Sequence, residues 1–303
     1  MRKVFLLLLL ATWQIVFSQD KLIVTTFNIW DPGDKEYWDE RGGYPVDRVV
    51  EYITEDSADI ILLQEVTLEK DVNQSYLGIK RQVEKLGYIY SAFYRPNWST
   101  GIGVVGYVRG MDSSGYPLAI FSKYPIMETM ARQTLNGMKM AKGVLSIRID
   151  LDGSDFFIFN THFTIGYPDS FNEMKKVVLP FVNSVAGGSP TLIGGDWNCP
   201  SAIDFPDKKM NVGKYTYSTK TDKLLLDAGF TDAYRSVHPE NNFPDDATYP
   251  GEKEEFLKRI DRIYLRNTNI KPVKVFIKEN IWEPYGLSDH RAVVFVFDGI
   301  EKK

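Results

Sequence analysis

The chain has 303 residues, of which 44% are hydrophobic and 25% are charged, a composition that excludes a disordered protein and supplies a large core. Its 36 basic and 40 acidic residues give a net charge of −4, so the chain as a whole does not attract nucleic acid or anionic membranes, although a local cleft or a bound metal ion still could. The single cysteine, Cys199, excludes an internal disulfide and is expected to be a small buried residue.

The first 18 residues predict a secretory signal peptide. Arg2 and Lys3 form a basic start, residues 5–11 are apolar, and residues 16–18 supply small side chains at the positions that a signal peptidase reads. The apolar run is too short for a helix that spans a bilayer, which needs about 20 residues. We therefore expect cleavage between Ser18 and Gln19 and a secreted or periplasmic protein. Because no linker or repeat interrupts the rest, residues 19–303 are expected to form one domain.

The first elements of the mature chain alternate between strand and helix. Residues 22–29 predict a strand, and apolar residues at helical spacing predict a helix over 46–53. Residues 58–63 form a nearly continuous apolar run, which suits an interior strand covered on both faces and ends at Gln64-Glu65. A second helix is expected over 76–86.

Strands dominate the chain from residue 88 onward. The clearest are expected over 102–108, 118–122, 144–151, 156–160, 191–195, 260–265, 273–277 and 292–297. Residues 171–181 predict a third helix, kinked at Pro180. Two blocks of strands with interspersed helices predict an α/β fold in which two sheets pack together and helices lie outside.

Polar residues that suit phosphoester chemistry stand at the ends of these strands, where loops collect functional groups on a rigid scaffold. Taken singly, each has a structural explanation: Asn28 suits a turn, Glu65 a strand end that reaches water, and His162 a hydrogen-bonded structural histidine. Together they meet the needs of phosphate ester hydrolysis. Mg²⁺ prefers oxygen ligands such as a carboxylate and an amide, and a histidine paired with a carboxylate is the usual base for activating water.

Six segments in chain order resemble the motifs of the endonuclease/exonuclease/phosphatase superfamily. They are Thr25-Thr26-Phe27-Asn28, Leu62-Leu63-Gln64-Glu65-Val66, Asn160-Thr161-His162-Phe163, Gly195-Asp196-Trp197-Asn198, Arg259-Ile260-Asp261-Arg262-Ile263 and Ser288-Asp289-His290. The resemblance spans the mature chain. It implies a four-layer α/β sandwich with two packed mixed β-sheets flanked by helices, as in deoxyribonuclease I, and an Mg²⁺-dependent phosphoesterase in which Mn²⁺ or Ca²⁺ could replace Mg²⁺.

The resemblance also assigns roles to individual residues. It implies the metal-binding residues Asn28, Glu65 and Asp289, and the catalytic residues His162, Asp196, Asn198, Asp261 and His290. His290, held by Asp261, would act as general base or balance charge on the phosphate, whereas Asp196 would orient or deprotonate the attacking water. The identity of the general base stays open because coupled groups share their titration. Asn198 would hold a phosphate oxygen, and His162 would bind the phosphoryl group or protonate the leaving oxygen.

Two positions depart from the family pattern. Trp30 stands where some repair nucleases carry an acidic residue, which puts a second metal ligand in doubt, and Arg262 stands where an aromatic residue is common. His162 makes the chain more similar to the deoxyribonuclease I and sphingomyelinase branches than to the abasic-site repair branch.

The substrate is less well defined, because the superfamily uses one kind of site on many esters. The leading prediction is a phosphodiester, in nucleic acid or in a small molecule. The alternatives are a lipid or sugar phosphoesterase, similar to sphingomyelinases or inositol phosphatases, and a catalytically silent protein that binds a glycan or other ligand. Aromatic residues in expected loops could stack bases, pack on sugars or enter lipid headgroups: Trp30, Tyr37, Trp38, Tyr44, Tyr94, Trp98, Trp282 and Tyr285. We expect a monomer.

Overall fold

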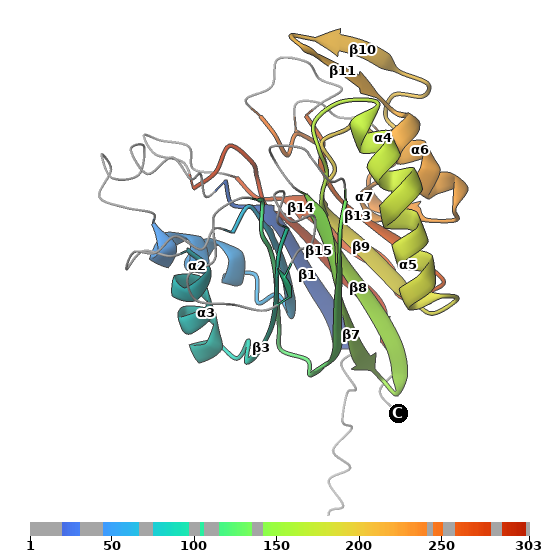
Figure 1. Ribbon diagram of the computed structural model, residues 1–303. Helices are drawn as coiled ribbons and strands as arrows, with labels where there is room; N and C mark the ends of the chain where they lie inside the picture. The colour runs from blue at the N-terminus through green and yellow to red at the C-terminus, as the bar shows by residue number, and fades with distance from the viewer. Residues whose placement is uncertain are drawn as a thin grey trace, which may run out of the picture.

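Two β-sheets packed face to face form the centre of the protein (Figure 1). The computed structural model describes residues 20–30, 45–66, 75–96, 104–105, 115–134, 142–240, 245–250, 258–279 and 287–300. The first sheet has seven strands in the order β14 (Lys271–Ile277), β15 (Val293–Ile300), β1 (Asp20–Asn28), β2 (Ile60–Gln64), β5 (Leu118–Ser122), β3 (Tyr90–Arg95) and β4 (Val104–Val105). The second has six, in the order β12 (Thr231–Asp232), β13 (Asp261–Arg266), β9 (Thr191–Asp196), β8 (Ser154–His162), β7 (Gly143–Leu151) and β6 (Ile126–Gln133).

Helices cover the outer face of each sheet (Figure 1). The first sheet is covered by α2 (Val46–Thr54) and α3 (Ser75–Lys85), and the second by α4 (Asp169–Glu173), the π-helical turn η1 (Met174–Val178), α5 (Leu179–Ala186) and α6 (Lys220–Asp227). A short helix, α7 (Ala233–Val237), follows β12. Strands β1 and β2 are parallel, as are β8 and β9, and the remaining pairs of described strands are antiparallel. The predicted four-layer sandwich of two mixed sheets is therefore confirmed.

Strand β2 shows why the apolar runs become interior strands. All five of its residues are buried, and because side chains alternate between the two faces of a strand, they serve two cores. Ile60 and Leu62 pack in the core between the sheets, whereas Ile61 and Leu63 pack under α2 and α3. A strand with both faces covered carries the next polar residue, Glu65, to the rim of the sheet.

Some predicted features differ from the structure. Tyr94, which we expected in a loop, is buried in β3, where its ring lies against Gly143; a Cβ atom at that glycine would come within 2.5 Å of it. The proline that follows Arg95 ends the strand. At the third helix, the irregularity expected at Pro180 is the π-helical turn that precedes it, since proline lacks the N–H of a regular helix. Of the strand expected over 102–108, residues 104–105 form β4 and the others lie outside the described residues.

The predicted signal peptide over residues 1–18 also lies outside the described residues. In the part of the chain that the structure does describe, no helix is both long and apolar enough to cross a membrane.

A buried ionic network fixes the loops that lead into β13. Arg259 Nε lies 2.8 Å from Asp204 Oδ2, and its Nη2 lies 2.8 Å from Asp232 Oδ2. Arg235 joins the same network through Asp204 at 2.5 Å and Asp246 at 2.7 Å. All five side chains are at most 5% exposed, so each charge depends on its partners for compensation.

Replacing Arg259 with methionine is expected to lower the free energy of unfolding by about 3–5 kcal/mol, because Asp204 and Asp232 would stay buried without their partner. Urea denaturation followed by circular dichroism measures the change. Arg148→Met is the control, since Arg148 pairs with Glu128 and Asp155 at the surface and its removal should leave stability nearly unchanged. Equal stability of the two variants would contradict a structural role for the buried network.

Candidate active site

The ends of four strands bring polar side chains together at one edge of the two sheets. Asn28 ends β1 beside Gln64 of β2, and His162 ends β8 beside Asp196 of β9. Because both pairs are parallel, the carboxyl ends of their strands meet at the same edge. Glu65 follows β2 with a φ of +58°, a left-handed conformation that is unusual for a residue other than glycine and occurs often at functional sites.

The remaining predicted residues enter from the C-terminal part of the chain. Asp261 begins β13 directly opposite Asp196, and Asp289-His290 precedes β15. Ser288 fixes this turn, because its hydroxyl donates to the Asn28 carbonyl at 2.7 Å and accepts from the His290 backbone N–H at 3.0 Å. A serine before the Asp-His pair therefore ties the last motif to the first.

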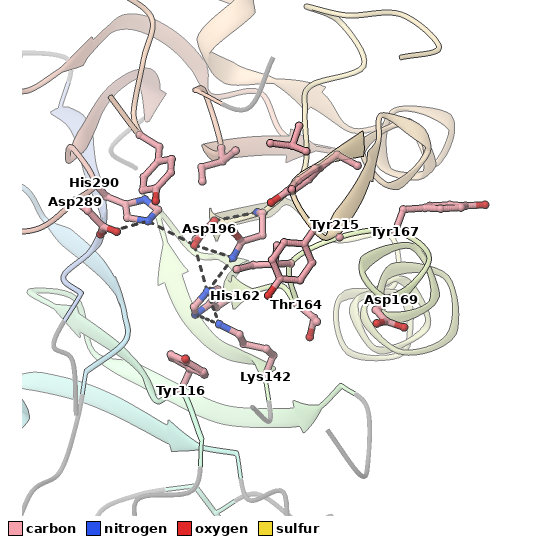
Figure 2. A pocket seen from close by; sticks show the side chains of 18 of the residues that line it. Tyr116, Lys142, His162, Thr164, Tyr167, Asp169, Asp196, Tyr215, Asp289 and His290 are labelled. Carbon is pink, nitrogen blue, oxygen red and sulfur yellow. Dashed lines mark hydrogen bonds and ion pairs between the residues drawn. The ribbon is translucent and has the colours of Figure 1, made fainter. Parts of the chain in front are cut away.

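Asp196 lies at the centre of the cluster and is 1% exposed (Figure 2). Its Oδ2 accepts hydrogen bonds from Asn28 Nδ2 and Asn198 Nδ2, both at 3.1 Å, and lies 3.2 Å from His162 Nε2. Its Oδ1 accepts from the Asn198 backbone N–H at 2.9 Å. Burial alone would raise the pKa of Asp196, but His162 and the charges of His290 and Lys142 hold that pKa below its usual range, so the carboxylate is ionised at neutral pH.

His290 is paired with Asp261, whose Oδ2 lies 2.9 Å from Nδ1 of the ring. Burial alone would lower the pKa of His290, but the carboxylates of Asp261, Asp289 and Asp196 raise it to about 10. The imidazole is therefore protonated at neutral pH. Its Nε2 lies 3.9 Å from Asp196 Oδ2 and 3.8 Å from Asp289 Oδ1.

The donor set suits a hard divalent cation. Ligand atoms of Glu65, His162 and Asp196 lie within 4.8 Å of one another, and Asn28 Nδ2 is 3.1 Å from Glu65 Oε1. Burial is the main cause that raises the pKa of Asp289, the charge of Glu65 adds to it and His290 opposes it, and both carboxylates line the same cavity. Carboxylate oxygens are ligands that Mg²⁺ takes, so Glu65 and Asp289 fit the predicted metal. Asn28 turns its amide nitrogen to Glu65 and Asp196, and its Oδ1 accepts from the Trp30 backbone N–H at 3.0 Å, so Asn28 would bind the metal only with its amide reversed.

Six of the eight predicted residues line one cavity of about 960 Å³: Glu65, His162, Asp196, Asn198, Asp289 and His290. The other two lie directly behind it, Asn28 hydrogen-bonded to Glu65 and Asp196, and Asp261 hydrogen-bonded to His290. The structure thus brings the whole predicted set together, and the role of each residue remains a prediction.

Lys142 lines the same cavity and was not predicted (Figure 2). Its Nζ lies 2.6 Å from His162 Nε2 and 3.5 Å from the centre of the Tyr116 ring. Burial lowers the pKa of Lys142 to about 8. Strands β7 and β8 pair with Gly143 opposite His162, so the register of this hairpin is the sequence signal that could have placed Lys142 beside the histidine.

Aromatic residues form much of the remaining cavity wall. Trp30 lines it as predicted, together with five tyrosines that sequence analysis did not select: Tyr116, Tyr167, Tyr215, Tyr217 and Tyr249. The other aromatic residues expected in loops, Tyr94 excepted, lie outside the described residues: Tyr37, Trp38, Tyr44, Trp98, Trp282 and Tyr285.

Two further residues near the motifs have structural roles. Arg262 is fully buried, donates to the Cys199 carbonyl at 3.0 Å and lies 3.5 Å from Asp222. Cys199 is buried as expected, and burial raises the pKa of its thiol to about 12, so it is not a nucleophile at neutral pH.

Comparisons with known proteins agree with this geometry. Residues 25–290 match the model of the Endonuclease/Exonuclease/phosphatase family. A comparison with curated proteins finds no match. Among solved structures, an endonuclease/exonuclease/phosphatase from Beutenbergia cavernae DSM 12333 is similar with a TM-score of 0.66 and 17% identity, over 92% of this chain and 71% of that one. A Bacteroides vulgatus member gives 0.64 and 16%, over 93% and 100%.

TDP2 from D. rerio, solved in complex with a single strand DNA product, is similar with a TM-score of 0.60 and 17% identity, over 92% of this chain and 99% of that one. At such identities the likeness of the solved structures shows the fold alone. The family model covers most of the chain, however, and its span includes all eight residues of the cluster. The chain therefore belongs to the Endonuclease/Exonuclease/phosphatase family.

Proposed function

We propose that this protein is an exported, Mg²⁺-dependent phosphoesterase that hydrolyses phosphodiesters by attack of water. Members of its family are phosphoesterases that depend on divalent metals. One observation carries the proposal: the predicted metal-binding carboxylates line the same cavity as the predicted catalytic groups. These residues are Glu65, Asp289, Asp196, Asn198, His162 and His290. A silent binding protein is disfavoured because every expected catalytic position is filled.

An Mg²⁺ ion held by Glu65, Asn28 and Asp289 would act as a Lewis acid that neutralises charge on the phosphoryl group. The protein's own groups then divide the proton chemistry. Asp196 is ionised and His290 is protonated at neutral pH, so of these two groups Asp196 is the one that can accept a proton from the attacking water. We therefore assign Asp196 as the base that orients and deprotonates water. The cationic His290, held by Asp261, stabilises negative charge on the phosphoryl oxygens.

His162, Asn198 and Lys142 form the opposite wall. Burial and Lys142 lower the pKa of His162, so its ring is neutral and suited to hydrogen bonding the phosphoryl group or the leaving oxygen. Asn198 Nδ2 lies 3.1 Å from His162 Nε2 and donates to Asp196 Oδ2 and the Phe163 carbonyl, so it would bind a phosphoryl oxygen by exchanging one of these acceptors. Lys142 adds a cation to this side, where negative charge accumulates as the ester bond breaks.

Replacing Lys142 with methionine is expected to lower kcat/KM about 100-fold, because it removes one preorganised donor from the phosphoryl-binding wall. Steady-state hydrolysis of a phosphodiester measures the effect. Lys123→Met is a matched control, since Lys123 also lies over a tyrosine ring, that of Tyr88 at 5.0 Å, but does not line the cavity. An equal loss of kcat/KM in the two variants, or no loss in Lys142→Met, would contradict a role of Lys142 in the reaction.

The charges of the described cavity wall favour a small diester over a long polynucleotide. The wall carries three cations, Lys142, Lys214 and the protonated His290, against four carboxylates: Glu65, Asp169, Asp196 and Asp289. A strand of nucleic acid needs a positively charged track for its phosphates, whereas one bound cation suffices for a single phosphodiester. Because one fold relative is a TDP2 that holds a single strand DNA product, a short oligonucleotide belongs among the substrates to be tested.

The proposed reaction is tested with bis-p-nitrophenyl phosphate and p-nitrophenyl phosphate, using residues 19–303 and His290→Ala in the presence of Mg²⁺. Turnover of the diester that is lost in the variant supports the proposal. Turnover confined to the monoester would instead indicate a sugar or inositol phosphatase. Absence of turnover with both esters and with an oligonucleotide would favour a binding protein.

Export rests on the signal peptide pattern over residues 1–18. We expect protein recovered from the periplasm or the culture medium to begin at Gln19, which mass spectrometry of the intact chain would detect. Recovery from the cytosol of a chain that still begins at Met1 would contradict export.

A further inference from the structure

A β-hairpin that belongs to neither sheet stands over one side of the cavity, at the top of Figure 1. It consists of β10 (Lys209–Val212) and β11 (Tyr215–Ser218), joined by Gly213 and Lys214. The hairpin is fixed to the loop after β8, because the Tyr167 backbone N–H donates to the Thr216 carbonyl at 2.6 Å. Gly166 allows this approach: it has a φ of +93°, and a Cβ atom there would lie 3.4 Å from the Tyr215 ring.

The face that the hairpin turns to the cavity is apolar and aromatic. Met210 pairs with Tyr217 and Val212 pairs with Tyr215, so these four side chains share one face, since directly opposed residues point the same way. Val212, Tyr215 and Tyr217 line the cavity, and the two tyrosine rings lie 6.3 Å apart. Tyr215 is 38% exposed, although hydrophobic and aromatic residues usually pack away from water.

Tyr116, which lies just before β5 of the first sheet, lines another part of the cavity wall (Figure 2). Its ring lies 5.4 Å from that of His162, and Lys142 Nζ lies over it. Burial, with smaller contributions from Glu65 and Tyr215, raises the pKa of Tyr116 to about 12, and both tyrosines line the cavity together with His162. Tyr215 and Tyr116 therefore flank the side of the site on which His162 lies.

We infer that Tyr215 and Tyr116 bind the leaving group of the substrate, and that this group carries a flat ring, either aromatic or the apolar face of a sugar. The inference rests on the proposed function, in which His162 serves the leaving oxygen. Tyrosine rings stack on flat groups, and their hydroxyls offer hydrogen bonds to ring substituents. A cavity of about 960 Å³ is of the size that holds a compact ligand.

The experiment compares binding of two ligands that cannot be hydrolysed, phenylphosphonate and methylphosphonate, by isothermal titration calorimetry with Mg²⁺. Glucose 6-phosphate, examined in the same way with Asp196→Asn protein, distinguishes a sugar from an aromatic ring. We expect phenylphosphonate or the sugar phosphate to bind about 10-fold more tightly than methylphosphonate. Tyr215→Ala should reduce that ratio to about threefold or less, whereas Tyr215→Phe should keep it because the ring remains.

Equal affinity of the wild-type protein for the two phosphonates, together with no tighter binding of glucose 6-phosphate by the Asp196→Asn protein, would overturn the inference. A ring preference that Tyr215→Ala leaves intact would overturn it as well. Because calorimetry needs no turnover, its failure is separate from failure of the proposed reaction. A ring preference without hydrolysis would support the ring-binding subsite and contradict the phosphoesterase reaction. Hydrolysis without a ring preference would support the reaction and contradict the subsite.

Discussion

Replacing Asp196 with asparagine is expected to lower kcat for diester hydrolysis about 1000-fold without unfolding the protein. In the proposed mechanism Asp196 accepts the proton from water, because at neutral pH it is ionised whereas His290 is already protonated. An asparagine has nearly the same shape but no basic oxygen, and its amide would place a donor against those of Asn28 and Asn198. The loss should therefore fall on kcat rather than on the Mg²⁺ requirement.

Steady-state kinetics with bis-p-nitrophenyl phosphate over a range of Mg²⁺ concentrations measures this effect. Asp155→Asn serves as the control, because Asp155 is a carboxylate on the surface with a side chain that is 55% exposed. If His290 were the base instead, the Asp196 variant would retain most of its activity at saturating Mg²⁺, and His290→Ala would show the larger loss.

Replacing Glu65 with glutamine is expected to raise the Mg²⁺ concentration for half-maximal activity at least about 100-fold. Even residues that only support a metal ligand cost about 10–100-fold in affinity or activity when they are replaced, and Glu65 is the principal ligand in the proposed site. The left-handed backbone of Glu65, with a φ of +58°, directs its side chain to the cluster. A glutamine at this position is expected to point the same way, so the substitution changes the charge rather than the position of the side chain.

The two variants should differ in their response to metal. High Mg²⁺ should restore much of the activity of Glu65→Gln, because the remaining donors can still bind a weakly held ion, but it should not restore Asp196→Asn. An unchanged Mg²⁺ midpoint in Glu65→Gln would mean that the metal binds elsewhere.

The strands that carry the site could be predicted because their residues are buried on both faces. β5 has the expected bounds, and β9 is one residue longer than expected because Asp196 itself completes the ladder with β13. In such strands apolar side chains occupy consecutive positions, and the polar residue that follows marks the rim. Asn28, Glu65, His162 and Asp196 each end or directly follow such a run, whereas Asp261 begins β13 and Asp289-His290 precedes β15. The last three residues were found through the resemblance of their segments to the motifs of the superfamily.

Lys142 and the hairpin of β10 and β11 could not be predicted from local pattern. Lys142 lies beside His162 because β7 pairs with β8, and no pattern in the residues around Lys142 indicates this pairing. The hairpin strands have four residues each and mixed polar and aromatic side chains, a pattern that does not separate a strand from a loop. The opposite error was made at Tyr94. We expected this aromatic residue in a loop near the site, but it is packed between the sheets.

The most direct test of the account is removal and return of the metal. Wild-type protein stripped with EDTA should lose its turnover of bis-p-nitrophenyl phosphate, and added Mg²⁺ should restore it in a saturable manner. Undiminished turnover in EDTA, or no turnover of this diester or an oligonucleotide at any Mg²⁺ concentration, would contradict a metal-dependent phosphodiesterase built on Glu65, Asp196 and His290.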